Sequence, residues 1–448
     1  MSHFEENLRR FSNDHPLEAL QITPSKNPLS LSKYENDSLD NLDVLFLQGV
    51  EKASAFSLLE IWPGKIILFE SDMGKLGQFF TQYEVPARAK LLMPSPGNYL
   101  KCAWETLFLR TGGEISKELM EMLDSVHLIA SDFADLGHKV LGNIEKNCAQ
   151  IECDGQELFG AFQGVPAVIC GAGPTLDRAI EKIKRLENRV LVIACGSALP
   201  LLTEKGCPVH LFAALDPDPP VSRFMRNTDH AVPVIYQNRL SHKILSLAHG
   251  RRLRMPGSGG YPADEWLCGE ETFDAGWNAG AFGIRLAKAF GCTQIYTAGI
   301  DGGYIDGKRY AKGVDDGGGT RDLFLAKSDL AGTLPFLEGT FEKMWDIRGM
   351  IHRKSLKKVM IDQSKLERWH QSRLRCQEIV SEWIEKLKNG QTKWDAYYAS
   401  NLEREAFFSH HISRVWEILR PVIERDMGNE LECTLNRILF YQKVVYER

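Results

Sequence analysis

Between residues 165 and 298 the sequence alternates short apolar runs with stretches in which apolar residues recur every three or four positions. The runs Val165–Cys170 and Val190–Cys195 are apolar throughout. Between them, Leu176, Ile180 and Ile183 would lie on one face of a helix. Strands that are apolar throughout are buried on both faces, which is typical of a parallel sheet covered by helices on both sides. The pattern therefore predicts a Rossmann-like domain. Its further strands are expected at residues 209–215, 232–236 and 294–298.

Three further segments surround this domain, which we place at residues 160–330. Residues 41–150 begin with a strand, helix, strand, helix pattern and predict a smaller accessory α/β domain. Residues 331–448 have long helical periodicity and predict a helical C-terminal region. Residues 1–40 are rich in Asn, Asp, Ser and Pro and predict an irregular lead-in. The expected fold class is α/β: a Rossmann-like parallel sheet preceded by a smaller α/β domain and followed by helices.

Charge and cysteine usage narrow the function classes. The chain of 448 residues carries 54 Lys+Arg and 59 Asp+Glu, a net charge of -5, which argues against a basic nucleic-acid-binding surface. Its ten cysteines include no Cys-x-x-Cys pair, so we expect reduced thiols in a cytoplasmic protein. We find neither a signal peptide nor a membrane span in the sequence, and no particular oligomeric state is predicted.

A glycine-rich loop follows the first apolar strand of the predicted Rossmann-like domain. Its residues are Gly171, Ala172, Gly173, Pro174 and Thr175. Backbone N–H groups and the helix dipole favour an anion at such a strand-to-helix turn, so we predict that the loop binds a nucleotide. The loop is not a dinucleotide fingerprint, because Leu176 stands where the third glycine would be, and it is not a P-loop. The structural alternative is a plain tight turn.

Polar residues also follow the next two predicted strands, in the loops Gly196-Ser197 and Asp216–Pro220. The carboxyl ends of parallel strands share one edge, where ligands bind in open α/β sheets. We predict that Gly196 and Ser197 contact the nucleotide and that Asp216 is catalytic. Asp216 and Asp218 also offer the oxygen ligands that Mg²⁺ or Mn²⁺ prefers, and this pair is the candidate metal site. The alternative is that Asp216 caps the following helix and Asp218 is a solvated turn residue.

A carboxylate, Asp301, directly follows the last apolar strand and is flanked by glycines. Its position predicts a second catalytic residue, acting as a base or binding a substrate hydroxyl. Lys308, Arg309 and Tyr310 follow on a glycine-rich segment and are predicted to bind phosphate or substrate as a mobile loop closes. An exposed charged loop is the alternative.

Two other polar residues lie at or near predicted strands and could have a functional role. Glu70 follows a strand of the accessory domain, a position suited to ribose binding, but we favour an accessory role for that domain over a second nucleotide site. His210 lies within an apolar strand and is interpreted as a core histidine. No residue spacing typical of a zinc site is visible.

The segments that carry these residues resemble a known family. They are Val165–Leu176 with its Gly-Ala-Gly-Pro-Thr-Leu sequence, Leu215-Asp216-Pro217, and Ala298–Gly302 followed by Tyr310-Ala311. Together they resemble the motility-associated factor (Maf) flagellin glycosyltransferases, whose central domain is also described as 6-hydroxymethylpterin diphosphokinase MptE-like. The resemblance covers about residues 160 to 315. Thr175 stands where serine is usual and keeps the hydroxyl.

The resemblance implies a nucleotide-binding core similar to that of the bacterial sialyltransferases. It further implies transfer of a nonulosonic acid, such as pseudaminic or legionaminic acid, from a CMP-activated donor to Ser or Thr of flagellin. Two other functions stay open: a 6-hydroxymethylpterin diphosphokinase-like phosphotransferase using ATP and Mg²⁺, and a non-catalytic interaction protein with a degenerate nucleotide site. We favour the glycosyltransferase, because a protein acceptor gives the flanking domains a use as docking surfaces.

Overall fold

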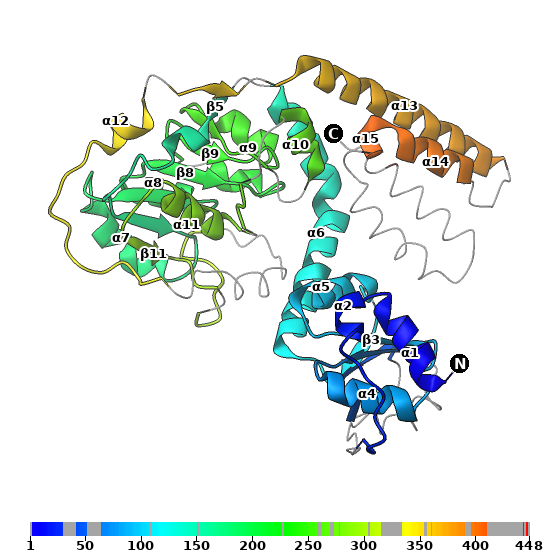
Figure 1. The fold of residues 1–448 in the computed structure, drawn as a ribbon. Coiled ribbons are helices and arrows are strands. Elements are labelled where there is room, and N and C mark those ends of the chain that lie inside the picture. The colour runs from blue at the N-terminus through cyan, green and yellow to red at the C-terminus, as the bar shows by residue number, and fades with distance from the viewer. Residues whose placement is uncertain are drawn as a thin grey trace. The chain divides into compact units, whose positions relative to one another are not determined.

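The computed structural model divides the chain into two compact units, one ending at Asp132 and the other starting at Phe133 (Figure 1). Helix α6 (Lys117–Cys148) runs through this division. The structure describes residues 2–29, 42–51, 64–107, 109–149, 152–225, 228–257, 261–268, 273–276, 278–302, 305–314, 334–353, 356–359, 361–389, 396–409, 442 and 445–446.

The first unit contains a parallel sheet of order β3-β2-β1-β4. Its strands are β1 (Val44–Gln48), β2 (Lys65–Phe69), β3 (Ala89–Leu92) and β4 (Thr111–Gly113). Leu45 and Leu47 of β1 point to one face and pack against α4 (Met73–Gln82). Val44 and Phe46 point to the other face and pack against α5 (Pro96–Glu105). This unit is the small parallel α/β structure that the sequence predicted.

The prediction of an irregular lead-in was wrong for residues 2–29. Helices α1 (His3–Ser12) and α2 (Pro16–Ala19) form there, and Phe11 is buried against α4. Ser2 and Glu5 cap α1 reciprocally: the Glu5 N–H donates to Ser2 Oγ at 3.3 Å and the Ser2 N–H donates to Glu5 Oε2 at 2.8 Å. This Ser-x-x-Glu spacing is a capping box, which the sequence displayed and which composition alone obscured.

Glu70 holds loops of the first unit together. It is buried, and its carboxylate accepts N–H donors from Val50 at 3.0 Å and from Ser71 and Asp72 at 2.8 Å each. Its oxygens are thus used by the backbone, which agrees with the accessory role that we favoured. A cavity of about 450 Å³ lies between α1, β2 and β3, and none of the residues predicted to bind ligand lines it.

The second unit is built on an eight-stranded sheet of order β11-β6-β7-β8-β9-β10-β5-β12, in which β12 alone pairs antiparallel. The strands are β5 (Glu152–Asp154), β6 (Ala167–Cys170), β7 (Leu191–Cys195), β8 (Leu211–Ala214), β9 (Val234–Tyr236), β10 (Arg252–Arg254), β11 (Ile295–Ala298) and β12 (Lys358–Val359). The five strands predicted from residue 165 onward are confirmed. The sequence did not predict β5, β10 and β12, which are two or three residues long and contain charged residues.

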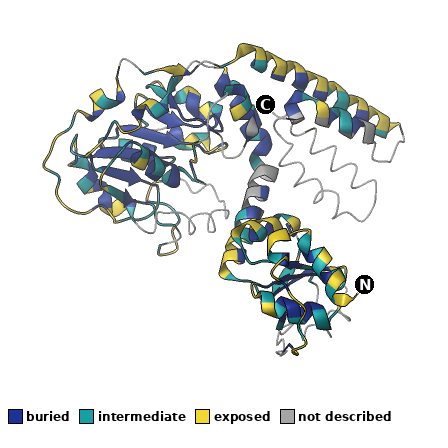
Figure 2. Cartoon of the chain, in the orientation of Figure 1, coloured by how far each residue is buried: buried dark blue, intermediate teal, exposed yellow. Residues whose placement is uncertain are grey.

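Helices cover both faces of this sheet (Figure 1). Val168 and Cys170 point into a core shared with α7, α8 and α9, whereas Ala167 and Ile169 point into a core shared with α11 and α12. The bounds of these helices are Leu176–Lys184, Ala198–Glu204, His242–Leu247, Ala279–Ala289 and Ile347–Ile351, respectively. The strands therefore lie buried between two helical layers, as Figure 2 shows. This alternation is why both faces of each strand had to be apolar.

His210 occupies the edge of this core as a satisfied buried residue, as predicted. Its Nδ1 accepts the N–H of Val192 at 3.0 Å and its Nε2 lies 3.2 Å from Asn188 Oδ1. Burial, together with the positive charge of Arg348, lowers the pKa of His210 to about 4. The neutral ring therefore serves packing and backbone hydrogen bonding.

The C-terminal helices pack on the last turns of α6. They are α10 (Pro262–Cys268), α13 (Gln363–Lys388), α14 (Ala396–Arg404) and α15 (Ala406–Ser409). Trp369 and Trp383 of α13 are fully buried in this cluster. The helical C-terminal region is confirmed to residue 409, and the predicted helices over 410–441 lie outside the described residues. None of the described helices has the length and apolar character needed to span a membrane.

Candidate active site

The predicted site residues lie along the carboxyl edge of the second sheet. From β6 the chain proceeds through β7, β8, β9 and β10 in one direction and then returns to place β11 on the other side of β6. The order thus reverses between β6 and β11, and ligands of open α/β sheets bind beyond the carboxyl ends of the strands at such a switch point. Two groups of side chains form at this edge.

The first group joins Asp301, after β11, to Thr175, at the start of α7. The Thr175 N–H donates to Asp301 Oδ2 at 2.9 Å, and its hydroxyl donates to Asp301 Oδ1. Thr175 Oγ1 in turn accepts the Gly299 N–H at 3.1 Å. A protein carboxylate therefore occupies the anion position at this helix N-terminus, where we had predicted a phosphate.

The glycines of this loop allow the two protein segments to approach each other. The Gly171 N–H donates to Ala298 O and the Gly173 N–H donates to Gly299 O, both at 2.8 Å. A Cβ atom at Gly173 would lie 2.4 Å from Asp301 Oδ2, and one at Gly171 would lie 2.3 Å from Gly299 O. We had predicted that this glycine-containing loop binds a nucleotide. The structure gives its glycines a packing reason, and nucleotide binding by this loop stays a prediction.

Removing the Thr175 hydroxyl should measure what this junction contributes to stability. Thr175→Val removes the hydroxyl that donates to Asp301 Oδ1 and accepts the Gly299 N–H, while the Thr175 N–H still donates to Asp301 Oδ2, and this loss should lower the free energy of unfolding by about 1–3 kcal/mol. Thr175→Ser keeps the hydroxyl and should differ little from the parent. Denaturant titration of the two variants tests this, and equal stabilities would show that the hydroxyl makes no such contribution.

The second group gathers around Tyr310. Arg223, in a short 3₁₀ turn (Val221–Phe224), has its guanidinium carbon 5.2 Å from the Tyr310 ring centroid, and that of Arg309 lies 5.0 Å from it. Arg223 Nη1 also donates to Ser197 Oγ at 3.3 Å. Two cations on one ring form a cation–π arrangement. The structure thus brings together residues that follow β7 and β11, as the edge argument predicted.

Asp216 belongs to this second group through its electrostatics. Its side chain is exposed, and Oδ1 accepts the Asp218 N–H at 3.0 Å. Protein packed around the carboxyl raises the pKa of Asp216 above its usual value, although the Asp218 N–H and the charges of Arg239 and Arg223 oppose this. A carboxylate that is surrounded by protein yet open to solvent is suited to accept a proton from a bound substrate.

Asp218, the second residue of the candidate metal pair, has a protein partner in this structure. Its carboxylate forms an ion pair with Lys139 of α6. Among the described residues, three side chains that could bind a metal lie within 4.8 Å of one another, and neither aspartate belongs to this group. The Mg²⁺ or Mn²⁺ site at Asp216 and Asp218 stays a prediction.

Lys308 is the last residue of a tight turn, and Arg309 and Tyr310 follow this turn. The N–H of Ile305 donates to Lys308 O at 3.0 Å and the N–H of Lys308 donates to Ile305 O at 2.9 Å. Asp306 and Gly307 have φ of 51° and 72°, the positive values of a type I′ turn. Lys308 is exposed beside this turn, while Arg309 and Tyr310 are half-buried.

The segment after this turn is held against the glycine loop. The Ala311 N–H donates to Ala172 O at 2.8 Å, which places Tyr310 over the sheet edge. The segment that we predicted as a mobile loop is thus structured over residues 305–314. The glycine run at 317–319 lies outside the described residues.

Sequence reasoning missed Arg223 and Arg239. Arg239 follows β9 by three residues, and the rule that strand ends share one edge would have pointed to it. Arg223 follows two prolines and carries no local signal of function. Its contacts with Ser197 and with Tyr310, 87 residues later in the chain, place it at the site.

Two comparisons with known proteins find similarities to this chain. Residues 138–307 match the model of a family described as 6-hydroxymethylpterin diphosphokinase MptE-like. The second unit thus contains a segment similar to that family. The match covers the strands that precede Thr175, Ser197 and Asp216, and it ends just before Lys308.

The whole chain also resembles a solved structure, described as the structure of MAf glycosyltransferase from Magnetospirillum magneticum AMB-1. The similarity covers 99% of this chain and 78% of that chain, with a TM-score of 0.51 and 13% sequence identity. The α/β fold class and the expected Maf-like fold are thereby confirmed. No protein with a curated description matches the sequence.

Proposed function

We propose that this protein is a glycosyltransferase that moves a sugar from a nucleotide-activated donor to a protein hydroxyl. The observation that carries the proposal is Arg223, whose Nε is buried and has no hydrogen-bond partner among the described residues. Its guanidinium stacks on Tyr310 and bonds to Ser197 beside Asp216. A guanidinium group at the carboxyl edge of a sheet that still has an unused N–H donor is suited to bind a phosphate oxygen.

The roles in the transfer follow from these positions. Arg223 and Arg309 neutralise the phosphate of the departing nucleotide as its bond to the sugar breaks. Asp216 accepts the proton of the acceptor hydroxyl while the new bond between the acceptor oxygen and the sugar forms. The raised pKa of Asp216 makes its carboxylate a stronger base than an ordinary aspartate.

We propose the donor and the acceptor from the resemblance to the Maf family. The donor is a CMP-activated nonulosonic acid and the acceptor is Ser or Thr of a flagellin-like protein. A diphosphokinase using ATP and Mg²⁺ is the second candidate, because it is the activity in the name of the matched family. The glycosyltransferase is favoured, since the fold likeness extends over 99% of this chain, far beyond the 138–307 match.

A ligand screen by thermal shift tests the proposal. We expect CMP to raise the Tm more than UDP, GDP or ATP with Mg²⁺, because a ligand at 100 times its Kd stabilises the native state by about 2.7 kcal/mol. Arg223→Gln should abolish the shift. Stabilisation by ATP with Mg²⁺ alone would favour the diphosphokinase, and no shift with any nucleotide would favour the non-catalytic protein.

Two adjacent cations should differ sharply in their effect on transfer. Arg309→Ala should reduce kcat/KM by about 10- to 100-fold, because it removes a charge that stacks on Tyr310 at the site. Lys308→Ala should change it less than about twofold, because Lys308 is exposed beside the turn. Steady-state kinetics on both variants measure this. Equal losses would place the phosphate site at the turn instead.

A further inference from the structure

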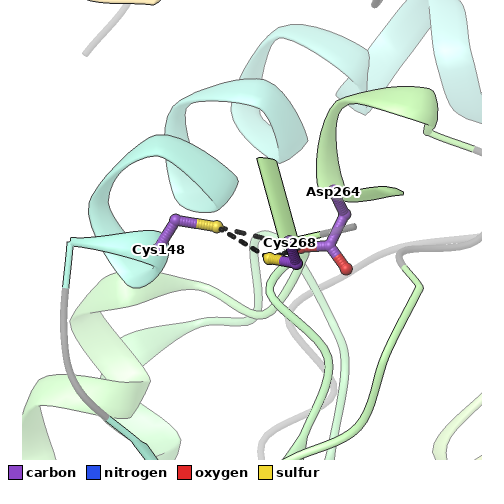
Figure 3. Close-up of side chains that lie close together, drawn as sticks. All are labelled: Cys148, Asp264 and Cys268. Atoms are coloured by element: carbon purple, nitrogen blue, oxygen red, sulfur yellow. Dashed lines mark hydrogen bonds between the residues drawn. The ribbon is translucent and has the colours of Figure 1, made fainter. Parts of the chain in front are cut away.

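Two cysteines and an aspartate meet in the second unit, apart from the proposed active site. Cys148 ends α6, and Asp264 and Cys268 lie four residues apart on α10, so that they share one helix face (Figure 3). The two Sγ atoms are 3.9 Å apart, and they lie 3.8 and 3.7 Å from Asp264 Oδ1. Cys148 and Asp264 are buried, and Cys268 is half-buried.

These separations are those of ligands around one small metal ion. Two sulfurs bound tetrahedrally at a Zn–S distance of about 2.3 Å stand about 3.8 Å apart, and a sulfur and a carboxylate oxygen stand about 3.5 Å apart. The three atoms thus form a nearly equilateral triangle of the required size. Thiolate together with oxygen ligands in a tetrahedral set favours Zn²⁺ over Mg²⁺ or Ca²⁺.

Asn238 supplies a second, independent indication. It is fully buried after β9, and its amide Nδ2 lies 2.5 Å from Asp264 Oδ1 and 3.1 Å from Cys148 Sγ. Its Oδ1 has no hydrogen-bond partner among the described residues. Since the two ends of an amide have nearly the same shape, rotation by 180° turns this unpartnered oxygen toward the cluster. The oxygen then faces the three atoms of the cluster and offers a fourth ligand to an ion among them.

The buried charges also balance. Asp264 Oδ2 accepts from Arg254 Nη2 at 3.4 Å, and both side chains are almost wholly buried. Entry of a divalent cation displaces the two thiol protons, so that one Zn²⁺ replaces two H⁺ and the net charge of the cluster is unchanged. A buried site can accept a metal at this low electrostatic cost.

We propose that Cys148, Asp264, Cys268 and Asn238 form a structural zinc site. Its effect is to fix the end of α6 against α10 and the loop after β9. Asn147 of α6 already donates to Asn238 O at 2.9 Å and Leu240 O at 2.8 Å, on either side of Arg239. Zinc reinforces this attachment and holds the loop that places the Arg239 charge near Asp216.

Metal titration of the full chain tests the site. Reduced, metal-free protein is titrated with Co²⁺ and then with Zn²⁺. We expect one Co²⁺ per chain with thiolate-to-cobalt charge-transfer absorption, displaced by an equal amount of Zn²⁺. Wild-type protein that shows no thiolate-to-cobalt absorption, or that binds Zn²⁺ without protecting its thiols from alkylation, overturns the proposal.

Variants assign the ligands. Cys148→Ser and Cys268→Ser should each lose the charge-transfer absorption, and Asn238→Ala should weaken Zn²⁺ binding by about 10- to 100-fold. Cys292→Ser is the matched control, because Cys292 is also half-buried but lies outside the cluster. In wild type, Zn²⁺ should protect Cys268 from alkylation and leave Cys292 reactive. Equal protection of both thiols by Zn²⁺ in the wild-type protein contradicts the site without reliance on a variant that fails to fold.

Discussion

Asp216→Asn should reduce sugar transfer by about a thousandfold and at the same time raise the Tm of the protein. The activity falls because the variant has no base to take the acceptor proton, a contribution of about 10²- to 10⁴-fold. Stability rises because the protein packed around the solvent-exposed carboxyl desolvates it and raises the pKa of Asp216, so that ionised Asp216 opposes folding. Release of the donor nucleotide and calorimetry at pH 7 measure the two effects.

The sign of the stability effect follows from proton linkage. The folded state binds the Asp216 proton more tightly than the unfolded state does, so stability falls as the pH rises from the unfolded pKa through the folded pKa. Above the folded pKa, this loss of stability is complete. An uncharged amide side chain at position 216 avoids the loss. The Tm gain of Asp216→Asn should therefore be present at pH 7 and disappear in acid, below both pKa values.

Asp218→Asn is the matched control for this prediction. Asp218 is two residues away, has a side chain that is 50% exposed, and loses only its surface ion pair with Lys139. Such a pair contributes about 0–1 kcal/mol, so this variant should keep both its activity and its Tm. A fall in Tm for Asp216→Asn, or equal activity of the two variants, would make Asp216 a structural turn residue.

The sequence predicted the strands of the second sheet that are covered on both faces, because such burial requires apolar residues. A strand such as β7, covered by helices on both faces, must be apolar at every position, and its residues 191–195 display this directly. The short strand β10 carries Arg252 and Arg254, whose charges are held by tertiary contacts, and so gave no such signal. Composition alone also failed to predict α1. The capping interaction between two residues stabilises this helix although the segment has a polar composition.

Position along the sheet edge predicted which residues matter, but it did not predict their partners. Asp301 was singled out because it ends a strand, and the structure does place it at the switch point. Its contacts, however, are with Thr175, which lies 126 residues earlier in the chain. The zinc ligands illustrate the same limit, since Cys148 and Cys268 are 120 residues apart and match no short motif. Only the fold brings such residues together.

Gly173→Val should destabilise the second unit by about 2–3 kcal/mol, in addition to any effect on nucleotide binding. The reason is steric: a Cβ at this position would lie 2.4 Å from Asp301 Oδ2 and 2.8 Å from Gly299 O, so that the loop after β11 must move away. That movement breaks the hydrogen bonds through which Asp301 holds the start of α7. The measurement is the urea midpoint.

Gly97→Ala is the control, because nothing lies within 4 Å of its added Cβ, and its stability should be unchanged or slightly higher. A Gly173→Val protein as stable as the parent but unable to bind nucleotide would restore the glycine loop as the phosphate site and leave Asp301 free to face substrate.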